Sequence, residues 1–174
     1  LYSSAASDVY KRQDLGGENF VDECALESDL QMSFPDDYVP SSSERMLLYR
    51  ELDGLERDED VEAFRLRMKD RFGEIPEEGE ELIRVVTLRR LGKCLGAEKI
   101  FLKAGRMVLY FVQNEKSAYF ESKAFGQCIA YAAMNAHRSN LREANGRRSM
   151  VIQEVRSVKD AVGILRQISE LQAV

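Results

Sequence analysis

The sequence predicts an α+β domain in which helices pack on antiparallel hairpins. Apolar residues first recur with the 3.6-residue period of helices, over residues 43–95, and afterwards with the two-residue period of strands. Ala104-Gly105 and Asn145-Gly146 lie between alternating segments and are typical of hairpin turns. Helices therefore precede hairpins, with one strand before both, which is an α+β order. With 174 residues, 44% of them apolar, the chain is long enough to bury the core of one domain.

The N-terminal part of this domain is expected to be a strand followed by a rigid connector. Apolar and polar residues alternate over residues 23–34, which favours a strand. Pro35 and Pro40 then enclose Asp37 and Tyr38. Each proline fixes its own φ and pushes the residue before it into an extended conformation. We therefore predict that this segment closes the strand.

Three helices follow in the predicted order. The first spans residues 43–55, and Asp58 is expected to cap the second. The apolar face of the second helix ends at Phe72, and Gly73 lies where a left-handed C-cap belongs. Pro76 is expected in the first turn of the third helix, over residues 77–95. The second helix places these residues on its buried face: Val61, Phe64, Met68 and Phe72.

The second half is expected to hold two hairpins, each followed by a helix. The predicted strands are Lys99–Lys103 with Arg106–Val112, and Asn140–Ala144 with Arg147–Val155. A last helix begins at Ser157, with Asp160 in a capping-box arrangement. The helix between the hairpins has one broad apolar face, formed by Phe125, Cys128, Ile129, Ala132, Ala133 and Ala136.

Charge is divided unevenly along the chain. Residues 14–81 contain 22 acidic and 7 basic side chains, whereas residues 82–174 contain 7 acidic and 16 basic ones. This asymmetry indicates either an interaction surface or two solvated halves that attract each other in the fold. No apolar run reaches the ~20 residues that span a bilayer, so we expect no membrane partner. Cys24, Cys94 and Cys128 lie in periodic apolar segments, and we expect buried, reduced thiols.

Nothing in the sequence predicts catalysis, a cofactor or a metal. His137 is the single histidine, and its place near a helix end favours a cap or surface role. The acidic clusters at residues 58–62 and 77–81 fit helix N-termini, where negative charge meets the dipole. The glycine pairs lack the Lys-Ser/Thr ending of a phosphate loop. We therefore expect no enzyme activity in this chain.

The basic second hairpin supports an alternative function in nucleic-acid binding. Arg138, Arg142, Arg147 and Arg148 cluster around its turn and could follow a phosphate backbone. No aromatic residue lies between Arg138 and Val174, so this segment itself offers no stacking platform.

Several motifs in fixed order resemble one family. They are Asp-Asp-Tyr-Val-Pro at residues 36–40, the segment SERMLLYRELD at 43–53, Asp-Arg-Phe-Gly at 70–73 and the helix at 81–95. Over residues 23–168 the chain is similar to the C-terminal domain of the bacterial transcription-repair coupling factor, Mfd, and most similar to the Bacteroides type. Its structural motif residues here are Pro35, Asp37, Tyr38, Pro40, Phe72, Gly73 and Pro76.

The resemblance implies a regulatory role rather than a catalytic one. The family are cytoplasmic ATP-driven DNA translocases that act on stalled RNA polymerase and recruit UvrA. Their C-terminal domain docks on the N-terminal UvrB-like module of the same protein and masks the UvrA-binding surface. We therefore expect a fragment of a longer protein, with a regulatory domain over residues 23–174. Residues 14–22 would be a linker remnant from the preceding motor domain, and residues 1–13 resemble a translated sequencing adapter.

The resemblance also implies docking residues. The helix that ends in Asp-Arg-Phe-Gly presents acidic groups to arginines of the UvrB-like module, and Asp70 fits that pattern. The position one turn earlier is acidic in the enteric type but is Arg67 here. We expect Asp70, Arg67 and Arg71 in the interdomain contact, with its charge complementarity altered at Arg67.

Overall fold

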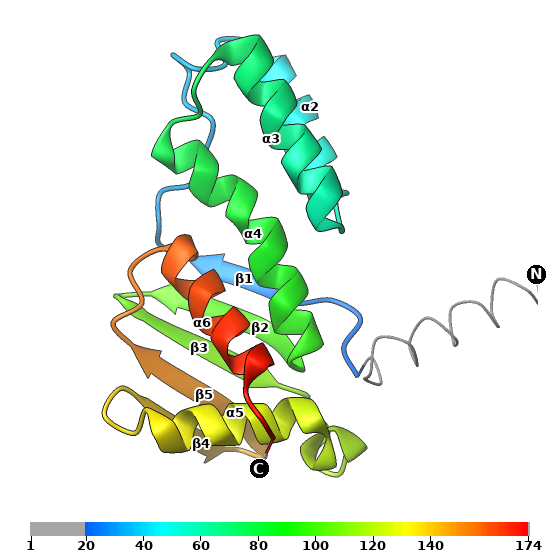
Figure 1. Ribbon diagram of the computed structural model, residues 1–174, viewed down its shortest axis with the longest axis vertical. Helices are drawn as coiled ribbons and strands as arrows, with labels where there is room; N and C mark the ends of the chain where they lie inside the picture. Colours follow the sequence, from blue (N-terminus) through cyan, green and yellow to red (C-terminus); the bar gives the residue numbers. More distant parts are fainter. Residues whose placement is uncertain (1–19, 174) are drawn as a thin grey trace, which may run out of the picture.

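The computed structural model describes residues 20–173, which form two lobes joined by one long helix (Figure 1). The fold is α+β, as predicted, with five helices and a mixed five-stranded sheet in the described residues. The helices are α2 (Ser42–Asp53), α3 (Asp58–Phe72), α4 (Glu77–Cys94), α5 (Lys123–Met134) and α6 (Val158–Glu170), with a short 3-10 helix at Ala118–Glu121. The strands are β1 (Ala25–Ser28), β2 (Ala97–Lys103), β3 (Arg106–Phe111), β4 (Ser139–Ala144) and β5 (Arg147–Gln153).

Both predicted hairpins are confirmed, and they form most of the sheet. The strand order is β1-β2-β3-β5-β4, in which β1 runs parallel to β2 and the other pairs are antiparallel. Ala104 and Gly105 turn the first hairpin with φ values of 54° and 72°, and Asn145 and Gly146 turn the second with 55° and 74°. Positive φ at both central residues matches the twist of the flanking strands.

One face of the sheet carries the larger core. Alternate strand residues, such as Ile100, Leu109 and Ile152, are fully buried against helices, because successive side chains of a strand point to opposite faces. Figure 1 shows α4, α5 and α6 on this same side of the sheet. The last helix begins as predicted, with the Ser157 hydroxyl accepting a hydrogen bond from the Asp160 amide at 3.0 Å.

A second, separate core forms the helical lobe. It contains Phe34, Val39 and Leu52 together with the buried face of α3 and Ile83 of α4. Helix α4 is long enough to contribute to both cores, since Leu88 and Leu91 lie in the core of the sheet lobe. The helical lobe is thus positioned on the sheet by a single continuous helix.

The first strand is shorter than the sequence predicted. Only residues 25–28 pair with β2, so the strand prediction for 29–34 is wrong. The Ser28 hydroxyl donates to the Leu102 carbonyl at 2.9 Å and accepts from the Leu30 amide at 3.0 Å, which turns the chain off the sheet edge. The alternation over residues 30–34 instead reflects a connector whose end, Phe34, is buried in the helical lobe.

Several local predictions also need correction. Helix α3 is preceded by Arg57, and no side chain caps it; Asp58 instead accepts from Arg90 of α4 at 2.9 Å. Ala133 is exposed and Ala136 lies beyond α5, because the helix ends at Met134.

Cys94 is exposed, whereas Cys24 and Cys128 are buried and burial raises the pKa of both thiols to about 12. The predictions made for residues 1–13 and 14–19 lie outside the described residues.

Phe72 and Phe64 should differ in their contribution to stability. Phe64 is 1% exposed, whereas Phe72 is only partly buried at the edge of the same core, contrary to the expected fully buried end of the stripe. We expect Phe64→Ala to lower the free energy of unfolding by about 3–5 kcal/mol and Phe72→Ala by clearly less. Urea titration of both variants checks this, and equal losses would contradict it.

Candidate functional site

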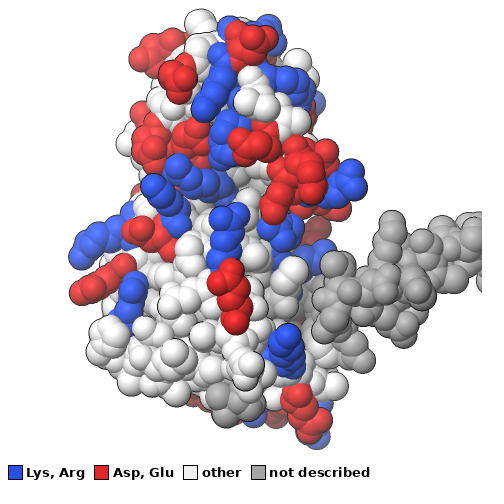
Figure 2. All heavy atoms as spheres, viewed as in Figure 1, with Lys and Arg blue, Asp and Glu red and all other residues white. Residues whose placement is uncertain are grey.

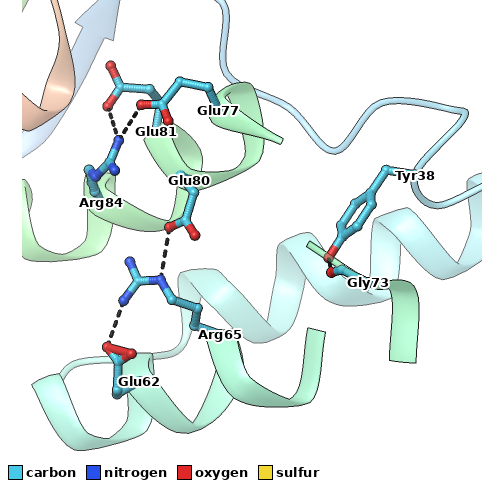
Figure 3. A network of polar contacts seen from close by, with 8 residues as sticks. All are labelled: Tyr38, Glu62, Arg65, Gly73, Glu77, Glu80, Glu81 and Arg84. Atoms are coloured by element: carbon cyan, nitrogen blue, oxygen red, sulfur yellow. Dashed lines mark hydrogen bonds and ion pairs between the residues drawn. The ribbon is translucent and has the colours of Figure 1, made fainter. Parts of the chain in front are cut away.

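The two sequence motifs meet in the helical lobe. The Tyr38 hydroxyl lies 2.9 Å from the Gly73 carbonyl and 3.3 Å from that of Met68, and Figure 3 shows Tyr38 pointing at Gly73. The rings of Tyr38 and Phe72 lie 5.7 Å apart. Burial, followed by the charges of Glu80 and Glu74, raises the pKa of Tyr38. Tyr38 therefore keeps its proton and ties the proline-bounded connector to the end of α3.

The proline-bounded connector is a turn that caps this lobe. The amides of Tyr38 and Val39 donate to the Pro35 carbonyl at 3.0 and 2.9 Å, and Val39 is fully buried. Arg45 of α2 donates to the Val39 carbonyl at 2.6 Å. Asp37 and Pro40 are exposed. The prolines therefore shape the turn, while Val39, which the sequence reasoning did not single out, anchors it.

Gly73 ends α3 in a conformation that differs from the predicted one. Its φ of 87° is positive as expected, but its ψ is −168°, outside the left-handed helical region. This region is accessible essentially only to glycine. It directs the chain to Pro76, which is the N-cap residue of α4 rather than its first helical residue. The result is a sharp corner between α3 and α4.

The three predicted docking residues lie on α3 but differ in what they contact. Arg67 forms an ion pair with Glu51, and Arg71 forms one with Glu44, so both arginines reach across to α2. Their guanidinium groups also lie over aromatic rings of their own helix. Asp70 is exposed and forms no ion pair within residues 20–173. The structure thus separates Asp70 from the two arginines.

A groove of about 170 Å³ lies beneath the two α2–α3 ion pairs. Apolar side chains form its floor and the paired charges form its rim. Arg67 and Arg71 already have carboxylate partners on α2, so neither arginine offers the groove an unpaired charge. Its lining residues are Leu48, Glu51, Phe64, Arg67, Met68, Arg71 and Phe72.

A family model described as the TRCF domain matches residues 28–122, more than half of the chain. The chain belongs to the TRCF domain family. A transcription-repair-coupling factor of Rickettsia bellii is 32% identical over 63% of this chain, and that of Escherichia coli K12 is 28% identical over 38%. The chain spans only 10% and 6% of the length of these two relatives, respectively.

The fold also matches a solved structure of the family. A crystal structure described as the C-terminal domain of transcription-repair coupling factor superposes with a TM-score of 0.62 at 17% identity. The match covers 85% of this chain and 96% of the other. This likeness establishes the fold, and the expected resemblance to the C-terminal TRCF domain is thereby confirmed.

A polar network braces α3 against α4 in this TRCF domain (Figure 3). Arg65 of α3 donates to Glu80 of α4 at 2.9 Å and to Glu62 at 2.6 Å. Arg84 donates to Glu77 at 2.8 Å. The glutamates at the start of α4, expected to serve only the helix dipole, therefore also have specific arginine partners.

Glu81 has a role that the sequence reasoning missed. Glu81 is 8% exposed, and its carboxylate accepts from the backbone amides of Val158 and Lys159 at 2.8 and 3.1 Å. It also accepts from Arg84 at 3.0 Å. Glu81 thus satisfies the first two amides of α6 from a different helix. No local sequence signal marks this contact, because the partners are 77 residues apart.

The charged halves of the chain meet in the fold. Arg84 and Arg90 pair with acidic residues of the first half, and Lys99 and Lys103 both pair with Glu27. Figure 2 shows acidic and basic atoms interspersed over the helical lobe, while the visible side of the sheet lobe is mainly uncharged. These contacts favour the interpretation of mutually attracting halves over a single-sign interaction surface on the helical lobe.

The basic hairpin is largely engaged within the domain. Arg147 pairs with Glu98 at 3.0 Å and Arg148 with Glu143 at 3.8 Å. Arg138 donates to the carbonyls of Gln153 and Glu154. Arg138 and Arg142 form no ion pair within the described part of the chain, and of these two Arg138 is held by its hydrogen bonds. The turn itself is therefore a weak candidate for a phosphate contact.

The remaining candidates are the single histidine and possible clusters of metal ligands. His137 is exposed in a turn after α5. Residues 20–173 contain no cluster of three or more His, Cys, Asp or Glu side chains placed to hold a metal ion. In the same residues, no helix is long and apolar enough to cross a membrane.

Proposed function

We propose that this TRCF domain is a regulatory module that docks on the N-terminal UvrB-like module of its parent protein. By docking there it masks the UvrA-binding surface until the motor engages. The proposal rests on the resemblance, and one observation on α3 supports it. The outward face of α3 pairs an exposed apolar side chain with an exposed carboxylate that has no ion-pair partner within residues 20–173.

This face is formed by Leu66 and Asp70. Leu66 is 61% exposed and lies four residues before Asp70, so the two side chains are neighbours on one helix face. Leu47 of α2 is 64% exposed and lies between the α3-paired Glu44 and Glu51 along its own helix. An exposed leucine beside an unpaired charge on α3, with a second exposed leucine on α2, contributes little packing or ion-pair energy to the isolated domain. This combination suits a contact with a cationic partner that has an apolar patch.

Arg67 and Arg71 support the docking face indirectly in this proposal. The buried face of α3 sets the orientation of the helix, and the exposed ion pairs of Arg67 and Arg71 with α2 add to it only weakly. The enteric type of the family has an acidic residue where this chain has Arg67. Because Arg67 is paired with Glu51, it does not place an unpaired positive charge opposite the arginines of the UvrB-like module. It leaves Asp70 as the carboxylate that meets them.

Replacing Asp70 by alanine tests the proposed role. Asp70 is exposed in the last turn of α3, where the negative end of the helix dipole disfavours a carboxylate. We therefore expect Asp70→Ala to leave the thermal midpoint of the isolated domain unchanged or slightly higher. In the full-length coupling factor, the same change should weaken docking and increase UvrA binding in the absence of polymerase and DNA. The increase should be roughly thirtyfold if the contact is partly buried and small if it is at the rim. UvrA pull-down and calorimetry measure both effects.

Glu170 provides a matched control for the Asp70 variant. It is also an exposed carboxylate at the C-terminal end of a helix, α6, and it lies in the other lobe. Glu170→Ala should also remove an unfavourable interaction between a carboxylate and the C-terminal end of a helix dipole, but it should leave UvrA binding unchanged. Unaltered UvrA binding by Asp70→Ala would place the docking contact elsewhere, and unfolding of that variant would make Asp70 a structural residue.

The remaining expectations belong to the parent protein and are proposals. We propose that the parent is a cytoplasmic ATP-dependent DNA translocase, through which this domain acts on UvrA, RNA polymerase and DNA. Residues 23–174 would be its C-terminal domain and residues 14–22 its linker, although Val21 of that segment is buried in the core of the sheet lobe. The similarity to the Bacteroides type and the adapter origin of residues 1–13 stay predictions.

A further inference from the structure

We propose that the sheet face opposite the helices binds single-stranded RNA, through an aromatic pair on β2 and β3 and the cationic side chains around it. This surface is in the sheet lobe and does not include Asp70 or Leu66. It is therefore independent of the proposed docking function, and either can fail without the other.

The open face is identified by the pairing register of the strands. Residues that alternate with the buried core positions point away from α4, α5 and α6. Phe101 of β2 pairs with Val108 of β3, and Tyr110 of β3 pairs with Lys99 and Ser149. None of these residues belongs to either core cluster. Phe101, Val108 and the β5 partner of Val108, Val151, lie in one row, and this row forms a separate apolar strip across the three central strands in which the two valines are buried.

Two aromatic rings occupy the centre of this strip. The Phe101 and Tyr110 rings are 5.4 Å apart and nearly perpendicular, and both are partly exposed. Cations lie over both rings: Lys99 and Lys103 are 4.6 and 5.1 Å from the centre of Phe101, and Arg147 is 5.6 Å from that of Tyr110. Lys99 and Lys103 have side chains that are 35% and 46% exposed. Cation–π contacts at exposed sites are weak, so these two side chains can swing outward and leave the Phe101 ring to a base.

The charge around the rings is positive. Five cationic side chains belong to this face: Lys99, Lys103, Arg106, Arg142 and Arg147. Glu27 and Glu98 are the acidic side chains that pair with them. Arg106 and Arg142 form no ion pair within residues 20–173. Two guanidinium groups, that of Arg106 on the same strand as Tyr110 and that of Arg142 beyond the Tyr110 partner Ser149, are therefore available for phosphates.

Arg147 has a buried hydrogen-bond donor without an acceptor, which is a further sign that this face binds a ligand. Its Nε atom is buried and has no hydrogen-bond acceptor in the described residues, although its terminal nitrogen pairs with Glu98. Buried donors in folded proteins are nearly always satisfied, and an exception calls for an explanation. A ligand oxygen that draws the Arg147 side chain away from Tyr110 would supply the missing acceptor.

These features match the chemistry of unpaired nucleotides better than that of a duplex or a protein. An open antiparallel sheet with aromatic rings on its central strands can stack about two or three unstacked bases. A duplex hides its bases and cannot use the rings. Exposed amides of Asn140 and Gln153 border the same face and can bond the ribose 2′-hydroxyl, which distinguishes RNA from DNA. The basic hairpin has no aromatic residue of its own. The first hairpin, which pairs with it in the sheet, supplies Phe101 and Tyr110 on the same face.

Fluorescence anisotropy of the whole chain with a labelled oligouridine of about 10 nucleotides, at about 50 mM salt, tests the proposal. Phe101→Leu and Tyr110→Leu keep an apolar side chain over the strip but remove the rings. We expect each to raise the Kd roughly tenfold. Arg106→Gln should reduce the slope of log K against log salt by about one. The oligodeoxyuridine and a duplex of the same length should bind more weakly than the RNA.

Arg166 provides the matched control, because it is an exposed arginine on α6 in the same lobe. Arg166→Gln should leave both the Kd and the salt slope unchanged. The proposal is overturned if the wild type shows no binding at about 50 mM salt, if the ring variants bind as tightly as the wild type, or if DNA binds as tightly as RNA. Polyglutamate is the probe for an acidic protein segment. The proposal is also overturned if the ring variants still bind RNA but no longer bind polyglutamate, because the face would then be a site for such a segment. Should a ring variant fail to fold, the exposed Arg106→Gln and Arg142→Gln still decide the outcome.

Discussion

Gly96→Ala should destabilise the domain by roughly 4 kcal/mol, because the substitution combines backbone strain with a collision in the core. Gly96 follows α4 with a φ of 87°. A Cβ atom there would lie 2.0 Å from the Tyr119 ring. Tyr119 is fully buried and its hydroxyl donates to the Leu95 carbonyl, so the ring cannot move aside without losing that bond. Burial raises the pKa of Tyr119, which keeps the hydroxyl protonated as the donor. Chemical denaturation of the variant measures the loss.

Two other glycines separate the components of this effect. Gly73 has the same φ of 87° but nothing within 4 Å of its Cβ position, so Gly73→Ala should show the strain alone, about 1–3 kcal/mol. Gly163 lies in α6 with open space around it, and Gly163→Ala should stabilise by about 0.5–1 kcal/mol. If Gly96→Ala costs no more than Gly73→Ala, Tyr119 does not constrain this position.

Glu81→Ala is expected to have a comparable effect for an electrostatic reason. The substitution removes the acceptor of the Val158 and Lys159 amides and leaves Arg84 without its less exposed partner. Val158 is fully buried, so water cannot replace the carboxylate at its amide. Removing one partner of a buried charge contact typically costs about 3–5 kcal/mol. Thermal and urea denaturation of the variant check this value.

The neighbouring Glu77 is the control for Glu81. It also pairs with Arg84, but its side chain is 73% exposed, so Glu77→Ala should cost about 1 kcal/mol or less. Glu81→Gln keeps one carbonyl oxygen for an amide of α6 and should fall between the two alanine variants. A Glu81→Ala loss as small as that of Glu77→Ala would show that the start of α6 is satisfied in another way.

The sequence by itself determined the local elements. The two-residue period and the turn dipeptides predicted both hairpins, and Asn145-Gly146 has the positive φ values that its residue types favour. The 3.6-residue period predicted the helices to within a few residues at their ends. Ser157 caps α6 as expected. These features depend on residues close together in the chain, whose patterns the sequence carries directly. The strand prediction for residues 29–34 is wrong because an alternating pattern fits any half-buried extended segment, whether or not that segment pairs with a neighbouring strand.

Only the tertiary structure decided how these elements meet. It placed β5 between β3 and β4 and β1 parallel to β2. It brought Tyr38 to Gly73 across 35 positions and Glu81 to α6 across 77. It also set Arg147 over Tyr110 and directed Arg67 to Glu51 while leaving Asp70 exposed. Such contacts connect residues far apart in the chain, and they depend on the packing of whole helices and strands. Periodicity fixes which face of an element is apolar, but it carries no information on which distant element will cover that face.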